Sequence, residues 1–148
     1  MTWAAKEDLY ARFGQEFINK LAIRRNYDEE TESYVASEDD ESIENVLNTA
    51  LEDAKTLILG KLSCKFANFQ IVNTMDFPSI KQWHIKMTIE VLKQGGDCTA
   101  CDCTKLDEFL CTNICTEDGF CLTSIKSFIS VSKPHFPCEA CKGDCKCC

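Results

Sequence analysis

The sequence lacks the features that mark membrane-spanning and secreted proteins. No apolar run approaches the roughly 18 residues that a membrane-spanning helix needs. The opening residues, MTWAAKEDLYARFG, carry acidic side chains where a signal peptide has a basic start and a leucine-rich stretch. We therefore expect a protein that is made and kept in the cytoplasm and that has no membrane partner.

The motifs of common enzyme classes are also missing. The chain has no glycine-rich phosphate loop, no HExxH pair and no GxSxG segment. The CxxC pair in DCTACDC follows two glycines without a convincing strand before it, which disfavours a thioredoxin-like redox site. Only His84 and His135 are present to act as a base for a cysteine nucleophile. We expect no enzymatic activity.

Basic residues are absent between Asn26 and Ala54. Residues 1–60 hold six Lys or Arg against fourteen Asp or Glu, whereas residues 61–148 hold ten of each, so the whole net charge of −8 comes from the first part. The segments DEETES and SEDDESIE predict an acidic loop, which either keeps the protein soluble or forms a surface that repels DNA or binds a basic partner. Direct nucleic-acid binding is disfavoured, because phosphate contacts need clustered Lys and Arg.

The length of 148 residues suffices for one core, and a composition of 45% apolar and 27% charged residues is typical of a globular protein. We predict a mainly α fold, a small helical bundle over residues 1–96 with a cysteine-rich, loop-rich extension over residues 97–148. Apolar spacing and end signals predict four helices: a first capped by Thr2 and ended by Gly14, a second over QEFINKLA, a third from Ser42 to Leu59 ended by Gly60, and a fourth from Pro78 to the glycine pair at 95–96.

Two parts of this assignment need comment. The segment CKFANFQIVNT is mixed in pattern, and an extended segment and a loop over the core both fit it. On the fourth predicted helix, His84 is expected to be a core or interface histidine, since no second histidine or acid lies at a neighbouring turn to complete a metal site.

Cysteine is absent before Cys64, and eleven of the twelve cysteines lie between Cys98 and Cys148. CxxC turns suit Zn²⁺, because both sulfurs reach one tetrahedral centre. The 36 residues between Cys101 and Cys138 exceed the roughly 15 to 20 of a zinc ribbon, so the spacing is not diagnostic of a combined site. A local site of Cys138, Cys141, Cys145 and Cys147 or Cys148 fits equally well. The candidate zinc ligands are Cys98, Cys101, Cys138, Cys141, Cys145, Cys147 and Cys148.

Disulfides are the competing interpretation of the same residues. Twelve is an even number, and a chain with this share of cysteine falls in the range where disulfide stapling is suspected. An iron–sulfur cluster is disfavoured, because no four-cysteine run fits the bacterial ferredoxin spacing. For His135, which lies near Cys138, a loop position is favoured over a role as a metal ligand.

The first half resembles the phage-Mu-like neck, or head-completion, protein family of tailed phages. The resemblance rests on TWAAKEDLYARFG, with Trp3, Ala4, Asp8, Leu9, Arg12, Phe13 and Gly14, and on a later helix with Ala50, Leu51, Asp53, Ala54, Leu57 and Leu62. It covers residues of about 2–62, and more loosely 78–95. Family members usually have few cysteines after this point, so the chain departs from the pattern beyond residue 96.

The resemblance implies a head–tail connector adaptor of the virion neck. Such proteins dock under the portal protein as a homo-oligomeric ring of about twelve copies. A further neck or tail-terminator protein lies below the ring, and the genomic DNA passes through it without specific binding. An acidic inner surface suits this role, since repulsion keeps the duplex from sticking.

In such a ring, the apolar stripe of the third predicted helix would serve both the monomer core and a contact between subunits. The candidate interface residues are Ile43, Leu47, Leu51 and Ile58. The alternative is that the whole stripe belongs to the monomer core. The alternative function for the whole chain is a free-standing zinc-binding interaction or regulatory module.

Overall fold

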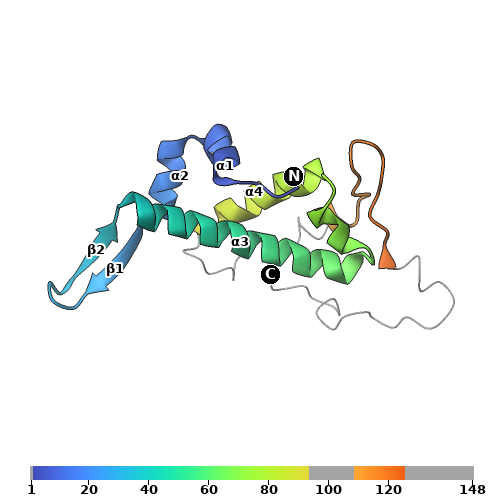
Figure 1. Cartoon of the computed structure of the whole chain (residues 1–148). Coiled ribbons are helices and arrows are strands. Elements are labelled where there is room, and N and C mark those ends of the chain that lie inside the picture. The colour runs from blue at the N-terminus through green and yellow to red at the C-terminus, as the bar shows by residue number, and fades with distance from the viewer. Residues whose placement is uncertain (1, 94–108, 126–148) are drawn as a thin grey trace.

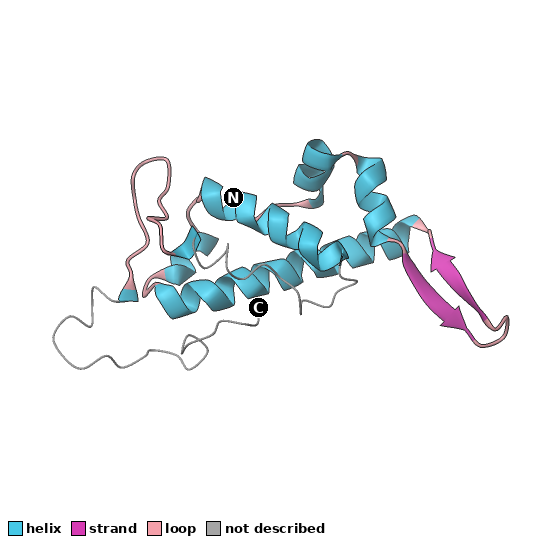
Figure 2. Ribbon diagram, turned by 180° about the vertical axis from the view of Figure 1, so that it is seen from behind, coloured by secondary structure: helices cyan, strands magenta, loops and turns pink. Residues whose placement is uncertain are grey.

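The computed structural model describes residues 2–93 and 109–125, and the fold is mainly α-helical (Figure 1). The elements are α1 (Lys6–Phe13), α2 (Gln15–Ala22), β1 (Arg24–Asp28), β2 (Ser33–Ser37), α3 (Asp40–Lys65), the 3-10 helix η1 (Phe69–Asn73) and α4 (Pro78–Lys93). Helix α3 is the axis of the molecule, and α4 packs along it while α1 and α2 cover one side (Figures 1 and 2).

Helix α3 confirms the third predicted helix but is longer at both ends. It runs over 26 residues, and its N-cap is Asp39, whose carboxylate accepts the Ser42 N–H at 2.8 Å. The prediction of Ser42 as the cap is therefore wrong. Asp40 and Glu41 in the first turn and Lys65 in the last turn complement the helix dipole.

Gly60 was predicted to end this helix, and it does not. It lies exposed inside α3, which continues for five more residues. Leu62, two residues further on, is fully buried, and Phe66, the C-cap residue, is 4% exposed. The burial of these two side chains outweighs the cost of about 1 kcal/mol for one glycine inside a helix.

The two short N-terminal helices meet at Gly14. This residue has a φ of 86°, so it ends α1 and at once begins α2. The predicted stop at Gly14 and the bounds of α2 are confirmed. Thr2 does not cap α1, which begins only at Lys6, and residues 2–5 instead lie along the body of the protein.

The first part of the acidic segment forms a β-hairpin and the second part begins α3, which corrects the prediction of a loop. Strands β1 and β2 are antiparallel, with Tyr27 opposite Tyr34 and Asp28 opposite Ser33. At the turn, the Asp28 carboxylate accepts the Glu30 N–H at 3.0 Å, and Glu32 adopts a left-handed φ of 47°. The hairpin projects beyond the N-terminal end of α3, away from the helices (Figures 1 and 2).

Helix α4 begins at Pro78, as predicted. The undecided segment before it resolves into the end of α3, a turn and η1. Eight residues of α4 are buried, which agrees with apolar side chains on two of its faces. The core therefore lies between α3 and α4 and is closed by α1, α2 and η1.

Residues 109–125 belong to the predicted C-terminal extension, yet they share this core. Leu110, Ile114 and Leu122 are buried in the same apolar cluster as the helices. The Ala67 N–H donates to Thr123 O at 3.0 Å, and Asn68 accepts the Thr123 N–H at 2.8 Å. The helical bundle thus includes at least this part of the chain beyond residue 96.

Across residues 2–93 and 109–125, none of the helices combines the length and the apolar character that crossing a bilayer requires.

Candidate functional site

The N-terminal residues form a clasp, defined here as residues 2–5, which ties the chain's start to the η1–α4 region. The buried Thr2 hydroxyl donates to Met75 O at 2.6 Å and accepts the Phe77 N–H at 3.0 Å. The Trp3 indole donates to Asn73 Oδ1 at 2.9 Å. Segments more than 70 residues apart in sequence are joined in this way, so the clasp gives the body one fixed geometry.

His84 lies at the centre of the clasp and is 1% exposed. Its Nδ1 accepts the Ala4 N–H at 2.9 Å, so the proton of the neutral ring is on Nε2, which donates to Leu51 O at 2.8 Å. The edge of the ring also meets Trp3 at 5.3 Å between centroids. The prediction of a core histidine is confirmed.

Burial lowers the pKa of His84 below its ordinary value. The bond to Leu51 and the carboxylates of Glu52 and Asp8 oppose this shift, while the Lys55 ammonium adds to it. A protonated ring would also lose the acceptor that the Ala4 N–H uses. The folded clasp therefore favours the neutral imidazole.

Two ion pairs hold α1 against α3 and α4. The Asp8 carboxylate accepts the Ala5 N–H at 2.8 Å and pairs with Lys81 of α4 at 3.0 Å, and both contacts lower the pKa of Asp8. Lys6 pairs with Glu44 of α3. These contacts explain why Asp8, a residue of the resemblance motif, is needed by the monomer itself.

The hairpin presents the largest exposed aromatic surface in the described residues. Tyr27 and Tyr34 are 55% and 71% exposed, and their rings meet edge to face at 5.3 Å. Arg25 and Ala36 lie on the same face by the strand register, and Val35, 49% exposed, lies on the other. Sequence patterning missed this element, although Tyr and Val in short runs on either side of EETE are a β-hairpin signal.

From Asn26 to Glu44, the rest of the hairpin and the start of α3 carry only negative charge. Residues 26–44 contain nine acidic and no basic residues. At the turn, the side chains of Glu29, Glu30 and Glu32 are exposed to solvent. The predicted acidic surface is therefore present, and its first part projects from the helical body on the hairpin (Figure 1).

A second exposed aromatic patch lies at the α1–α2 elbow; we call Arg12, Phe13 and Phe17 the elbow patch. The Phe13 and Phe17 rings are 37% and 45% exposed and 6.4 Å apart, and the Arg12 guanidinium carbon lies 5.7 Å from the centre of the Phe13 ring. Arg12 and Phe13 belong to the resemblance motif, and neither is used by the monomer core.

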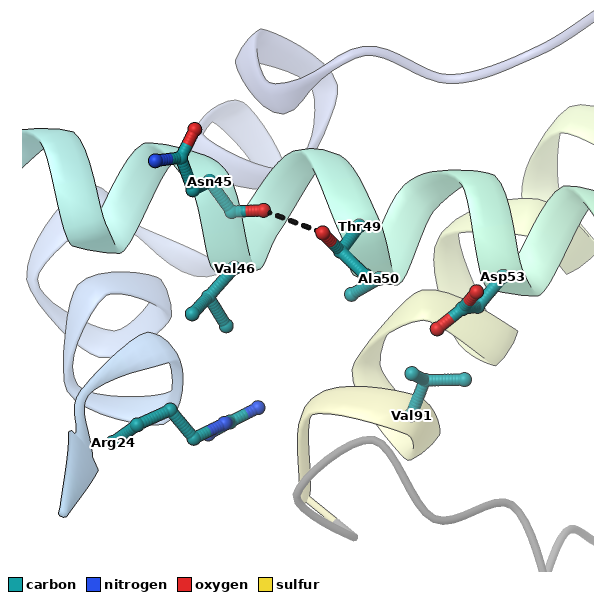
Figure 3. A pocket seen from close by; sticks show the side chains of 7 residues that line it. All are labelled: Arg24, Asn45, Val46, Thr49, Ala50, Asp53 and Val91. Atoms are coloured by element: carbon teal, nitrogen blue, oxygen red, sulfur yellow. Dashed lines mark hydrogen bonds between the residues drawn. The ribbon is translucent and has the colours of Figure 1, made fainter. Parts of the chain in front are cut away.

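A shallow cavity of about 220 Å³ lies between α3, the end of α4 and the start of β1 (Figure 3). Val46, Ala50 and Val91 line it, with Arg24 and Asp53 at its edges. The Arg24 guanidinium donates to Leu21 O at 2.7 Å and to Leu92 O at 3.4 Å, so it joins the C-terminal ends of α2 and α4. Arg24 therefore anchors the base of the hairpin to these two helices.

The predicted interface residues are all buried within the single chain. Their exposed fractions are 7%, 0%, 8% and 0% for Ile43, Leu47, Leu51 and Ile58. In the folded monomer they form the core between α3 and its neighbours. A contact between subunits has to use other, exposed side chains.

The candidate zinc ligands lie outside the described residues: Cys98, Cys101, Cys138, Cys141, Cys145, Cys147 and Cys148. Zinc thus stays a prediction. Among the cysteines that are described, Cys115 and Cys121 form a disulfide, and Cys111 is an exposed free thiol. In residues 2–93 and 109–125, no three His, Cys, Asp or Glu side chains gather in a way that could hold a metal ion.

Comparison with protein-family models, with curated proteins and with solved structures finds no match for this chain. Its function is therefore argued from the surfaces described above.

Proposed function

We propose that this protein is a structural component of a tailed-phage virion, a neck adaptor that forms a ring under the portal and links head to tail. The observation that carries the proposal is the acidic surface of residues 26–44, which begins on the projecting hairpin and continues along the start of α3. An acidic surface of this kind around a DNA passage repels the phosphate backbone and keeps the duplex mobile.

The positions of the resemblance-motif residues in the structure also support the proposal. Ala4 and Leu9 are buried and Asp8 is ion-paired, so these residues serve the monomer. Arg12 and Phe13 are exposed. A motif that continues onto the surface suits a protein that contacts a neighbouring chain.

The proposal is tested with particles of the phage or prophage that encodes the chain. We expect quantitative mass spectrometry of purified virions to find this chain in amounts comparable to the portal protein. Deleting its gene should leave DNA-filled heads without tails, and the wild-type gene supplied in trans should restore tailed particles. Absence of the chain from purified virions, or normal tailed particles after the deletion, would contradict the proposal.

A matched pair of variants separates the acidic surface from the fold. Glu38→Gln with Asp40→Asn and Glu41→Gln removes three negative charges from the exposed acidic residues between the hairpin and the first turn of α3. Glu52→Gln with Glu90→Gln and Glu117→Gln removes three from α3, α4 and the 115–121 loop. We expect both triple variants to enter particles, and only the first to slow passage of DNA through the neck, measured as the rate of DNA ejection. Equal rates would show that the negative charge between the hairpin and α3 has no role in DNA passage.

A further inference from the structure

The hairpin face with Tyr27 and Tyr34 is left largely uncovered by the described part of the chain. A two-stranded hairpin is marginally stable alone in water, and this one projects from the body instead of packing along it (Figure 2). Its two aromatic rings are more than half exposed. Exposed tyrosine pairs on a protruding element are the kind of surface that binds protein partners.

The elbow patch is the complement of this face within the same chain. It offers two further half-exposed rings, those of Phe13 and Phe17, beside the positive charge of Arg12. In the described part of the chain, no carboxylate forms an ion pair with Arg12. Its guanidinium lies over the Phe13 ring instead.

The hairpin turn and the elbow patch carry opposite charges. Asp28, Glu29, Glu30 and Glu32 lie at the turn, whereas the one charged side chain of the elbow patch is Arg12; α1 and α2 around it are balanced, with three basic and three acidic residues. Opposite patches on one chain favour contact between copies, because each copy offers both halves.

The hairpin cannot reach the elbow patch of its own chain. The patch surrounds Gly14 at the start of α2, and β1 begins two residues after the end of α2. Figure 1 shows the hairpin leading away from the elbow, on the opposite side of α2. The two surfaces therefore have to meet between molecules.

We propose that the hairpin of one copy docks on the elbow patch of a second copy, with Tyr27 and Tyr34 against Phe13 and Phe17 and the turn carboxylates beside Arg12. Because different surfaces of the two copies meet, the contact is head to tail, and it closes into a ring or continues as a filament. This contact rests on the proposed function, because it is the contact that builds the ring. The carboxylates between the hairpin and α3 take no part in it and face the DNA.

The test measures self-association of the full-length protein by sedimentation velocity, up to about 1 mM protein and at low salt. We expect the wild type to form head-to-tail oligomers that dissociate at about 1 M salt. Tyr34→Ser should weaken association at least about 10-fold, as loss of a central aromatic contact does. Phe120→Ser is the matched control, because Phe120 is 40% exposed but lies in the loop between Cys115 and Cys121, and it should leave association unchanged.

A charge exchange identifies the two surfaces. Glu29→Lys with Glu30→Lys and Glu32→Lys reverses the charge of the hairpin turn, where only Asp28 then stays negative, and Arg12→Glu reverses the charge of the elbow patch. Each variant alone should be monomeric, since its own two surfaces then carry the same sign. An equimolar mixture should associate again, because every contact in an alternating assembly joins opposite charges. Circular dichroism spectra equal to that of the wild type would show that the variants are folded.

The outcomes separate this contact from the neck assignment. A wild type that is monomeric under all these conditions, or a mixture that stays monomeric, overturns the contact. If the Tyr34→Ser variant and the charge variants self-associate as strongly as the wild type, the contact is overturned as well and another interface is indicated. None of these results decides whether the chain occurs in virions, which the particle experiment tests independently.

Discussion

The helical body and the hairpin of this chain use aromatic and polar side chains in opposite ways. In the body, Phe77 is fully buried and the polar groups of Thr2 and His84 are hydrogen-bonded to distant backbone. In the hairpin, Tyr27 and Tyr34 are exposed and the turn carboxylates face water. The body buries its aromatic and polar groups within the single chain, whereas the hairpin leaves them exposed, as the proposed contact with a second copy requires.

The strongest test of this comparison removes a core ring. Phe77→Ala should lower the free energy of unfolding by about 3–5 kcal/mol, because it leaves a cavity in a fully packed site. Phe17→Ala on the elbow patch should change it by about 0.5 kcal/mol or less. Urea unfolding followed by circular dichroism measures both, and similar losses for the two variants would mean that the elbow ring is part of the core.

The clasp gives the next largest effect. Thr2→Val keeps the shape of the side chain but removes the hydroxyl that serves Met75 O and Phe77 N. Leaving these two backbone groups without a partner should cost about 1–3 kcal/mol of unfolding free energy. Thr56→Val, at an exposed position of α3, is the control and should be near neutral. A neutral Thr2→Val would show that water replaces the hydroxyl.

His84 makes the stability of the body depend on pH. Its pKa is lowered in the folded state, so below the ordinary value of 6.5 the unfolded chain binds a proton that the folded chain does not. The free energy of unfolding should therefore be constant above this pH and fall below it, by at most about 1.4 kcal/mol per pH unit until the folded pKa is reached.

The matched variant His84→Gln has no titrating group at this position. We expect it to be less stable than the wild type near neutral pH, with a difference that narrows as the pH falls from about 7 to about 5. Urea unfolding of both proteins at each pH gives the difference. A constant difference across this range would mean that His84 does not titrate differently in the two states.

The smallest expected effect belongs to the hairpin. Tyr34→Ser removes one member of a cross-strand pair whose rings are largely in water, and should lower the unfolding free energy of the body by less than about 1 kcal/mol. The same variant is expected to abolish most self-association. A large loss of stability would instead make the hairpin part of the body's core.

The helices were predictable from the helical spacing of their apolar residues and from the signals at their ends. The bounds of α2 and the start of α4 at Pro78 follow from local signals, and the stripe through Leu47, Ala54 and Ile58 is the buried face of α3. The end of α3 was missed, because a glycine ends a helix only when no buried residue continues the pattern, and Leu62 continues it.

The candidate site was only partly predictable. The acidic charge between residues 26 and 44 is visible in the sequence, but the hairpin was hidden, because its strands are five residues long and rich in polar side chains. The exposure of Phe13 and Phe17 also escaped, since Phe17 lies on the apolar side of a short amphipathic helix and would ordinarily be counted as core.

The sequence by itself determined the helical class, the burial of the α3 stripe and the sign of the charge before it, since periodicity and charge are local properties of the chain. Only the tertiary structure decided that Thr2, Trp3 and Ala4 clasp α4 through His84, and that two aromatic pairs stay on the surface. These features depend on contacts between segments more than 70 residues apart and on which side chains those contacts leave uncovered.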